Sequence, residues 1–315
     1  MRAIVIRSKG GPEVLELSDE PEPQTDELLV AVEAIGVNYR DVYEREGRGA
    51  AYGRAPVPRI IGAEGAGTVL RGAGEFAPGD RVAWAAADGS YAERVAVPVA
   101  QAVRVPDGTS SELAAAALLQ GMTAHYLSHS TYPVQPGDVT LVHAAAGGVG
   151  LLLVQMIKAR GGYVVATTST EEKAELARGA GADETVGYDA FGARLRELGG
   201  AHVVYDAIGA TTFEASMAAL RARGMLVLYG MASGPAPAVD PQALQARSLY
   251  LTRPGLPDYT ATREELEWRA GEVLGWIADG SLEVRIGGRY PLEDARRAHE
   301  DLEARRTTGK LILVP

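Results

Sequence analysis

Between residues 136 and 253, β-rich runs alternate with helical stretches, and this alternation limits the possible folds more than any other feature of the chain. The runs are VTLVHA, YVVATTS, ETVGY, HVVYDAIG, GMLVLYG and SLYLTR, and helices are expected between them, for example over residues 148–160 and 171–178. Strands that alternate with helices form a parallel sheet with helices on both faces. The pattern therefore predicts an α/β domain with a doubly wound parallel sheet.

The first strand of this domain runs into a glycine-rich turn, HAAAGGVG, over residues 143–150. A dinucleotide-binding turn needs a tight bend, a position where the backbone can reach the pyrophosphate, and a position where helix and strand pack closely. Ala145, Gly147 and Gly150 fill these positions, with Gly148 and Val149 between the last two. Alanine at the first position is tolerated if its φ stays negative. We predict a Rossmann domain that binds a dinucleotide; the alternative is an ordinary connection between strand and helix.

The end of the second strand indicates which dinucleotide is bound. An NAD site has a carboxylate there for the ribose 2′-hydroxyl, but residues 166–170 read ATTST and contain no acid. Ser169, Lys173 and Tyr188 could instead hold a 2′-phosphate, which favours NADPH. Alternatively, Ser169 caps the next helix in a capping box with Glu172, and Lys173 is a solvated surface charge.

Residues 1 to about 117 have short apolar alternations broken by glycine, proline and acidic turns, which predicts a mostly β unit, a distorted barrel. A serine-capped helix near Ser111 leads out of it, and a capped helix near Thr262, a further helix and a last strand follow the Rossmann region. We expect the last strand to return to the barrel. The predicted domains are therefore residues 1–122 with 261–315, and residues 123–260.

Charge and composition narrow the function. The net charge is −10 and acids and bases are interleaved, which argues against nucleic acid as the main partner. Cysteine is absent, so redox chemistry must use a bound cofactor, and no long apolar run predicts a signal peptide or a membrane span. We expect a cytoplasmic protein. Only four lysines occur, Lys9, Lys158, Lys173 and Lys310, against 27 arginines, which suggests that these lysines have particular roles.

Six ordered motifs together resemble one superfamily: GVNYRD (36–41), GAEGAGTV (62–69), PGDRV (78–82), HAAAGGVG (143–150), VVYDAIG (203–209) and YLTRP (250–254). They resemble the medium-chain dehydrogenases/reductases, and among these the zinc-independent, ζ-crystallin-like NADPH:quinone oxidoreductases. The resemblance implies a GroES-like β-barrel catalytic domain joined to a Rossmann domain, with the active site in the cleft between them. It also implies an enzyme that passes reducing equivalents from nicotinamide C4 to a quinone.

The same comparison bears on metal. Zinc-dependent relatives hold the metal with a cysteine and a histidine at the positions that are Asn38 and Ala63 here, and Glu64 alone remains. One carboxylate cannot hold a zinc ion that needs three protein ligands. His125 and His129 have the i, i+4 spacing of a metal clip, but with no third ligand we interpret them as surface or interdomain histidines. We predict no metal.

The resemblance places Asn38, Tyr43 and Tyr52 near the nicotinamide, where Asn38 could orient the carboxamide or the substrate oxygen and the tyrosines could wall the quinone or donate a hydrogen bond. Packing on the barrel surface is the alternative for both tyrosines. Further cofactor contacts are implied for Thr123, Gly230, Ser233 and Arg253.

Three functions remain open at this point. The favoured one is an NADPH-dependent quinone reductase, by hydride or by single-electron transfer; the others are an enone or enoyl-thioester reductase and a non-catalytic NADPH-binding protein, crystallin-like or RNA-binding. For assembly, residues 248–254 are expected to form an edge strand without lysine and with proline only at its end. In the resembling family this edge pairs with its two-fold mate, so we expect a homodimer.

Overall fold

The computed structural model describes residues 1–49 and 53–315, and its backbone divides into two compact units. The first comprises Met1–Leu119 and Thr262–Pro315, and the second comprises Gln120–Ala261. The first division between the units falls inside helix α3 (Ser111–Tyr126). At the start of this helix the Ser110 hydroxyl accepts a hydrogen bond from Leu113 N–H at 3.2 Å. The first unit is therefore built from both ends of the described chain.

The second unit contains a six-stranded parallel sheet with the order β11-β10-β9-β12-β13-β14. The strands are β9 (Val139–Val142), β10 (Tyr163–Thr167), β11 (Glu184–Val186), β12 (Ala201–Asp206), β13 (Leu220–Leu228) and β14 (Tyr250–Thr252). Counted along the chain this order is 3-2-1-4-5-6, that of a doubly wound Rossmann sheet. The predicted fold of this region is confirmed.

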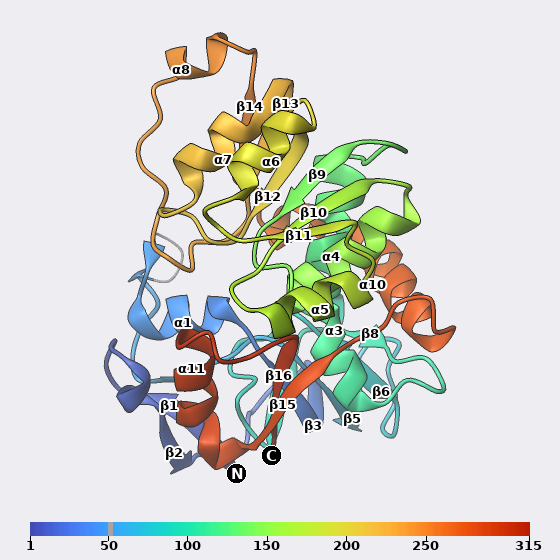
Figure 1. The fold of residues 1–315 in the computed structure, drawn as a ribbon. Helices are drawn as coiled ribbons and strands as arrows, with labels where there is room; N and C mark the ends of the chain where they lie inside the picture. The colour runs from blue at the N-terminus through green and yellow to red at the C-terminus, as the bar shows by residue number, and fades with distance from the viewer. Residues whose placement is uncertain (50–52) are drawn as a thin grey trace. The chain divides into compact units, whose positions relative to one another are not determined.

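Helices pack on this sheet in two groups, α4 with α5 and α6 with α7 (Figure 1). The helical segments are η3 (Leu127–Thr131), α4 (Gly148–Ala159), α5 (Glu171–Gly179), α6 (Phe191–Glu197), α7 (Phe213–Ala219), α8 (Gln242–Gln245) and α9 (Leu256–Tyr259). Leu141, Val165 and Val204 are fully buried in the sheet, as expected for strands covered on both faces.

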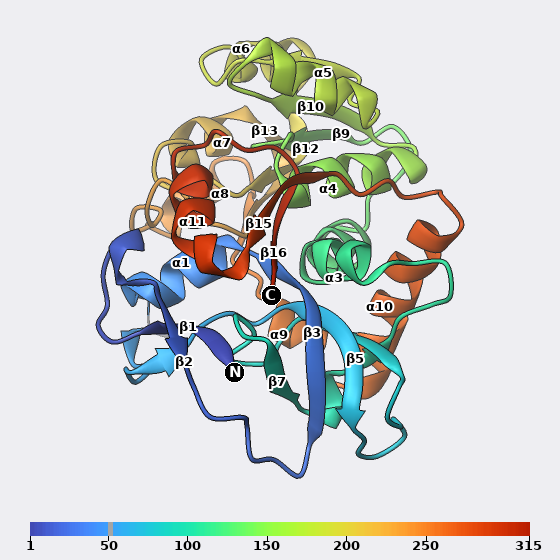
Figure 2. The same cartoon turned by 90° about the horizontal axis from the view of Figure 1, so that it is seen from below.

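The first unit contains a seven-stranded sheet, in which β15-β16-β3-β5-β6-β8 are neighbours and β7 also pairs with β3, and a small sheet of order β2-β1-β4. Figure 2 shows β3 running alongside β5 and β7. The strands are β1 (Arg2–Ile6), β2 (Glu16–Asp19), β3 (Leu28–Val37), β4 (Arg59–Ile60), β5 (Gly65–Arg71), β6 (Arg81–Trp84), β7 (Arg94–Val97), β8 (Val103–Arg104), β15 (Ile286–Pro291) and β16 (Lys310–Val314).

Strand β3 is central because it is long and almost continuously apolar, and Val30 and Ile35 are fully buried. Its partner β16 is antiparallel, with Leu311 opposite Val37, which brings Lys310 next to Asn38 at the end of β3. The helical segments of the first unit, apart from α3, are η1 (Pro12–Val14), α1 (Tyr39–Glu46), η2 (Val99–Gln101), α10 (Arg263–Ala278), η4 (Leu292–Asp294) and α11 (Ala295–Glu303).

No helix within residues 1–49 and 53–315 is both long enough and apolar enough to span a membrane.

Candidate active site

The glycine-rich turn connects β9 to α4 in the second unit. Ala144, rather than Ala145, has the left-handed backbone (φ 50°), so the negative φ required at Ala145 is present. Gly147 N–H donates to Ala144 O at 2.9 Å, and Gly147 caps α4 with φ −78°. A Cβ on Gly150 would lie 2.5 Å from Ala144 O and 2.7 Å from Ala145 Cα. The close packing that the third glycine provides in a dinucleotide turn is therefore observed.

Beneath this turn, buried polar groups tie three strand ends together. His143, fully buried, shares hydrogen bonds with Thr167 Oγ1 at 2.8 Å and Ser216 Oγ at 2.9 Å. Asp206 Oδ2 accepts from Ser216 Oγ at 3.2 Å and Thr212 Oγ1 at 2.7 Å, and its Oδ1 accepts from two backbone N–H groups. Burial lowers the pKa of His143 to about 4, so the imidazole is neutral at pH 7. These residues hold the turn in place and were not predicted as site residues.

The predicted 2′-phosphate residues follow the ends of β10 and β11. Ala144 N–H donates to Tyr188 Oη at 3.1 Å, so the Tyr188 hydroxyl lies at the glycine-rich turn. Thr170, not Ser169, caps α5, because Thr170 Oγ1 accepts from Lys173 N–H at 3.3 Å. The capping box with Ser169 is therefore wrong by one residue. Ser169 is exposed just before the cap, and Lys173 lies half-buried in the first turn of α5.

Other predicted cofactor residues have structural roles in the second unit. A Cβ on Gly230 would lie 2.8 Å from Ala207 Cα, so the loop after β13 packs directly on that after β12. The Ser233 hydroxyl donates to Ile208 O at 2.8 Å and accepts from Thr211 N–H at 3.1 Å. Arg253 is exposed and donates to Leu228 O at 2.9 Å. Thr123 is buried in α3, and Val149 lies in the first turn of α4. Their contacts with a cofactor stay predictions.

In the first unit, Asn38 belongs to a buried polar cluster with Glu64 and Lys310. The Lys310 ammonium donates to Asn38 Oδ1 at 2.7 Å and to Glu64 Oε2 at 2.5 Å. Asn38 Nδ2 donates to Glu64 Oε2 at 2.7 Å and to Gly36 O at 3.3 Å. All three residues are at most 4% exposed. Lys310 was not predicted as a site residue, although a lysine at the start of the apolar run KLILV is unusual in a buried strand.

A second buried network of hydrogen-bonded side chains reaches the backbone of Asn38. Arg45 Nη1 lies 3.1 Å from His299 Nδ1, His299 Nε2 lies 3.1 Å from Tyr91 Oη, and Tyr91 donates to Asp41 Oδ2 at 3.0 Å. Because arginine only donates, Nδ1 must accept and Nε2 carries the proton toward Tyr91. Asp41 Oδ2 in turn accepts from Asn38 N–H at 2.8 Å. The start of α1 is thereby fixed through its first turn.

Burial shifts the pKa values of His299, Tyr91 and Asp41. Burial, with a smaller contribution from the nearby Arg45 guanidinium, lowers the pKa of His299 to about 3. Burial raises the pKa of the Asp41 carboxyl. Burial and the neighbouring Asp41 carboxylate raise the pKa of the Tyr91 phenol well above its usual value. The imidazole and the phenol are thus uncharged at pH 7, and neither is set up as a solvent-facing acid or base.

The two predicted tyrosines have different outcomes. Tyr43, in α1, is 8% exposed, and its ring centroid lies 6.2 Å from that of Tyr39. Tyr43 is therefore packed inside the first unit, and its contact with a quinone stays a prediction. Tyr52 lies outside the described residues, 1–49 and 53–315.

The residues that the resemblance relates to zinc ligands lie in the first unit, where Asn38 Nδ2 donates to Glu64 Oε2 at 2.7 Å. Within the part of the chain that the structure describes, no cluster of three or more His, Cys, Asp or Glu could hold a metal ion. The Glu64 carboxylate instead accepts hydrogen bonds from Lys310, Asn38 and, at 2.6 Å, Leu119 N–H. His125 and His129 stack with centroids 4.4 Å apart, and His125 is fully buried, so a surface location is wrong for it. Metal independence itself stays a prediction.

Comparison with known proteins agrees with this geometry. Residues 24–107 match the alcohol dehydrogenase GroES-like domain, and residues 148–268 match the zinc-binding dehydrogenase family. A quinone oxidoreductase of Pseudomonas aeruginosa is 43% identical, covering 100% of this chain and 99% of the relative. The chain belongs to the quinone oxidoreductase family of medium-chain dehydrogenases/reductases. The predicted GroES-like and Rossmann architecture is confirmed.

Two further relatives bear on cofactor and substrate. The structure of a mycobacterial protein complexed with NADPH is similar, with 49% identity, a TM-score of 0.95 and coverage of 100% of both chains. A 2-haloacrylate reductase of a Burkholderia species is 36% identical, covering 99% of this chain and 98% of the relative. The family therefore includes an enzyme named for an unsaturated acid as well as those named for quinones.

Proposed function

We propose that this protein is an NADPH-dependent quinone reductase that works without a metal. The observation that supports the function most directly is the match to quinone oxidoreductases along the whole chain, together with a dinucleotide turn whose second strand ends without a carboxylate. When bound, NADPH supplies the reducing equivalents from nicotinamide C4. The chain itself must bind the cofactor, select the 2′-phosphate and orient the reacting rings.

The fit to NADPH rests on the second unit. Gly147 and Gly148, at the start of α4, have no side chains, so a phosphate can approach the backbone there. The N-terminus of a helix also favours a bound phosphate through its partial positive charge. Lys173 offers an ammonium in the first turn of α5, and the Tyr188 hydroxyl lies at the glycine-rich turn, where it accepts from Ala144 N–H. We assign Ser169, Lys173 and Tyr188 to the 2′-phosphate, because all three follow the strand ends where a Rossmann sheet places the adenosine ribose.

For the nicotinamide end we propose Asn38, with Tyr43 and Tyr52 beside the quinone. Both hydrogens of the Asn38 amide are donated within the first unit, to Glu64 Oε2 and Gly36 O. Asn38 therefore acts through its shape and its carbonyl oxygen, and the reduced quinone oxygen takes its proton from another group or from solvent. Thr123, Gly230, Ser233 and Arg253 complete the proposed cofactor contacts.

Assays with several acceptors test the function. Purified protein should oxidise NADPH with 1,4-benzoquinone and 9,10-phenanthrenequinone at least about tenfold more efficiently, in kcat/KM, than with crotonyl-CoA or 2-chloroacrylate. A preference for the thioester or the haloacrylate would show that the protein is an unsaturated-carbonyl reductase instead. This is the second candidate function, because one relative is named 2-haloacrylate reductase. NADPH binding without turnover of any acceptor would indicate a non-catalytic protein.

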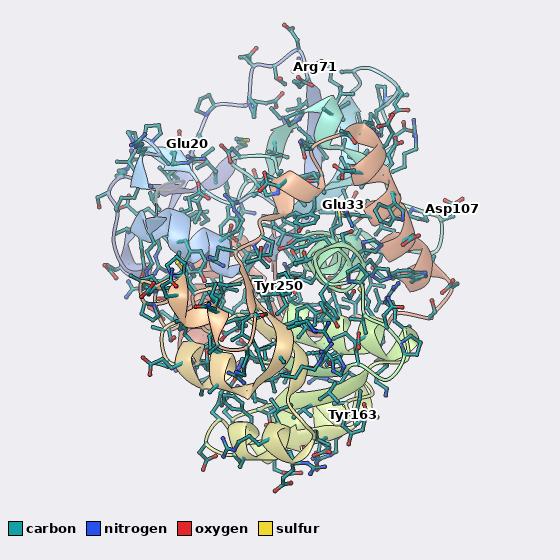
Figure 3. The ribbon with its side chains drawn as sticks, turned by 90° about the horizontal axis from the view of Figure 1, so that it is seen from above. Glu20, Glu33, Arg71, Asp107, Tyr163 and Tyr250 are labelled. Carbon is teal, nitrogen blue, oxygen red and sulfur yellow. The ribbon has the colours of Figure 1, made fainter. Side chains whose placement is uncertain are left out.

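We also propose a homodimer that pairs through β14, and a cytoplasmic location; the latter stays a prediction from the sequence. Strand β14 is at the edge of its sheet, and Tyr250 on it is 57% exposed; Figure 3 labels it. An exposed edge strand with a large apolar side chain favours pairing with a second copy. Light scattering at micromolar concentration should give twice the mass of the chain, and Tyr250→Pro should reduce the mass to that of a monomer.

A further inference from the structure

We propose that Lys310 and Glu64 are positioning residues, which fix the side-chain amide of Asn38 in one orientation. The inference rests on the proposed function, since that function places Asn38 beside the nicotinamide. Neither Lys310 nor Glu64 is proposed to touch NADPH or the quinone. Their effect on the reaction would come only through Asn38.

The register of the sheet brings the three side chains together. Strand β16 begins at Lys310 and is antiparallel to β3, with Leu311 opposite Val37, so Lys310 reaches the residue that follows β3, Asn38. Glu64 directly precedes β5 on the other side of β3, where Gly36 N–H donates to Glu64 O at 3.2 Å. Three neighbouring strands thus contribute one group each to the same point.

The hydrogen bonds allow only one amide orientation. The ammonium lies 2.7 Å from Asn38 Oδ1, while Nδ2 faces the Glu64 carboxylate and the Gly36 carbonyl. A half-turn of the amide would set its NH2 against the ammonium, with donor facing donor, and its oxygen against two acceptors. The assignment of O and N in Asn38 is therefore determined by its charged neighbours.

The pair is more than a means of joining strands. Lys310 is 1% exposed and Glu64 is fully buried, and a buried ion pair is often matched or exceeded in stability by well-packed apolar side chains. The fold also makes room for the carboxylate: a Cβ on Gly36 would overlap Glu64 Oε2 and lie 2.6 Å from Ala115 O. A polar neighbour with a defined orientation, Asn38, explains why charge is kept here.

A single variant that removes one charge and a double variant that removes both distinguish a positioning role of the pair from a role in stability. Lys310→Met leaves Glu64 buried without its cation, and the melting temperature should fall by about 10 °C. In Glu64→Gln/Lys310→Met the buried charge is gone, so the melting temperature should return to within about 3 °C of that of the unmodified protein. The amide is no longer held, however, so kcat with 1,4-benzoquinone should stay about tenfold lower. The NADPH dissociation constant, from fluorescence titration without acceptor, should change less than about threefold.

A kinetic cycle with Asn38→Ala tests whether the pair acts through Asn38. Asn38→Ala should lower kcat about tenfold in the unmodified protein but less than about twofold further in the double variant. Lys158→Met, which removes a lysine paired with Asp183 at 2.8 Å in the second unit, is the matched control and should leave kcat unchanged. Effects that multiply, or a stable double variant with normal kcat, would overturn the proposal. If the double variant does not fold, Glu64→Leu/Lys310→Met, which also removes both charges, serves as the background, with the same expectations.

A measurement without turnover keeps this proposal separate from the proposed function. In 15N-labelled protein the two Nδ2 protons of Asn38 should exchange slowly with solvent, and exchange should become at least about tenfold faster in Glu64→Gln/Lys310→Met. Absence of quinone reduction by the unmodified protein would refute the proposed function alone. Equal exchange rates in the two proteins would refute the positioning role, whatever the activity.

Discussion

Replacing Gly150 by alanine tests the dinucleotide turn most directly, because helix propensity and packing predict opposite results. Gly150 lies in the first turn of α4, where alanine is the better helix former by at most about 1 kcal/mol. The new Cβ would lie 2.5 Å from Ala144 O and 2.7 Å from Ala145 Cα, whereas ordinary contacts begin at 3.4 Å. Both contacted atoms belong to backbone, so the helix start must move away from the turn by a large fraction of an ångström.

Such overpacking costs about 1–3 kcal/mol, which exceeds the gain in propensity, so packing decides the sign. We expect Gly150→Ala to destabilise the protein by about 1–2 kcal/mol in urea unfolding. Because the displaced backbone is the part that would bind the pyrophosphate, the NADPH dissociation constant should rise about tenfold or more. Fluorescence titration with NADPH measures this directly, without any acceptor.

Gly271→Ala is the matched control. Gly271 is exposed in the middle of α10, and a Cβ there would have no neighbour within 4 Å. This variant should gain about 0.5–1 kcal/mol and bind NADPH normally. If Gly150→Ala proved as stable as Gly271→Ala and bound NADPH as tightly as the unmodified protein, the close contact between turn and helix would not be needed for cofactor binding.

Three further predictions concern charge and metal. Lys173→Ala should raise the Michaelis constant for NADPH about tenfold through loss of about 1.5 kcal/mol or more, while that for NADH hardly changes; equal losses for both would assign the lysine to the fold. Dialysis against EDTA or phenanthroline should leave quinone reduction intact, and elemental analysis that finds one tightly held zinc per chain would contradict the absence of a metal. Burial lowers the pKa of His299 to about 3, so between pH 6.5 and 3 the imidazole is protonated in the unfolded state but not in the folded state. The free energy of unfolding should therefore fall as the pH drops through this window. The variant His299→Gln, which cannot titrate, should lose less stability than the unmodified protein between pH 7 and 5 in thermal unfolding.

The sequence predicts the second unit well because its signals are local. Strand runs, helix starts and the turn at residues 143–150 all depend on neighbours within a few positions, and the alternation of strands with helices predicts a parallel sheet covered on both faces. The cap of α5 was misplaced because Ser169 and Thr170 are adjacent residues of the same capping type, and only the hydrogen bond from Lys173 N–H distinguishes them.

The first unit was predicted less completely. Strand β15 has two glycines and no apolar alternation, β2 is short and mostly exposed, and β4 has two residues, so none of them gives a strand pattern. Their places depend on pairing with distant segments: β15 with β16, and β2 and β4 with β1. The register between such distant segments cannot be read from any short stretch of the sequence.

The same reason explains which site residues were missed. Asn38 could be predicted because it stands inside a motif, but Lys310 is 272 residues away from it, and His299 lies 208 residues from Tyr91. The scarcity of lysine was a signal for Lys310, though it gave no partner. Both networks end on Asn38, one at its side chain and one, through Asp41, at its backbone N–H. A single asparagine that is held at its side chain and at its backbone by buried polar groups is fixed before any ligand binds, so the nicotinamide and the quinone proposed to bind there would have to adapt to it.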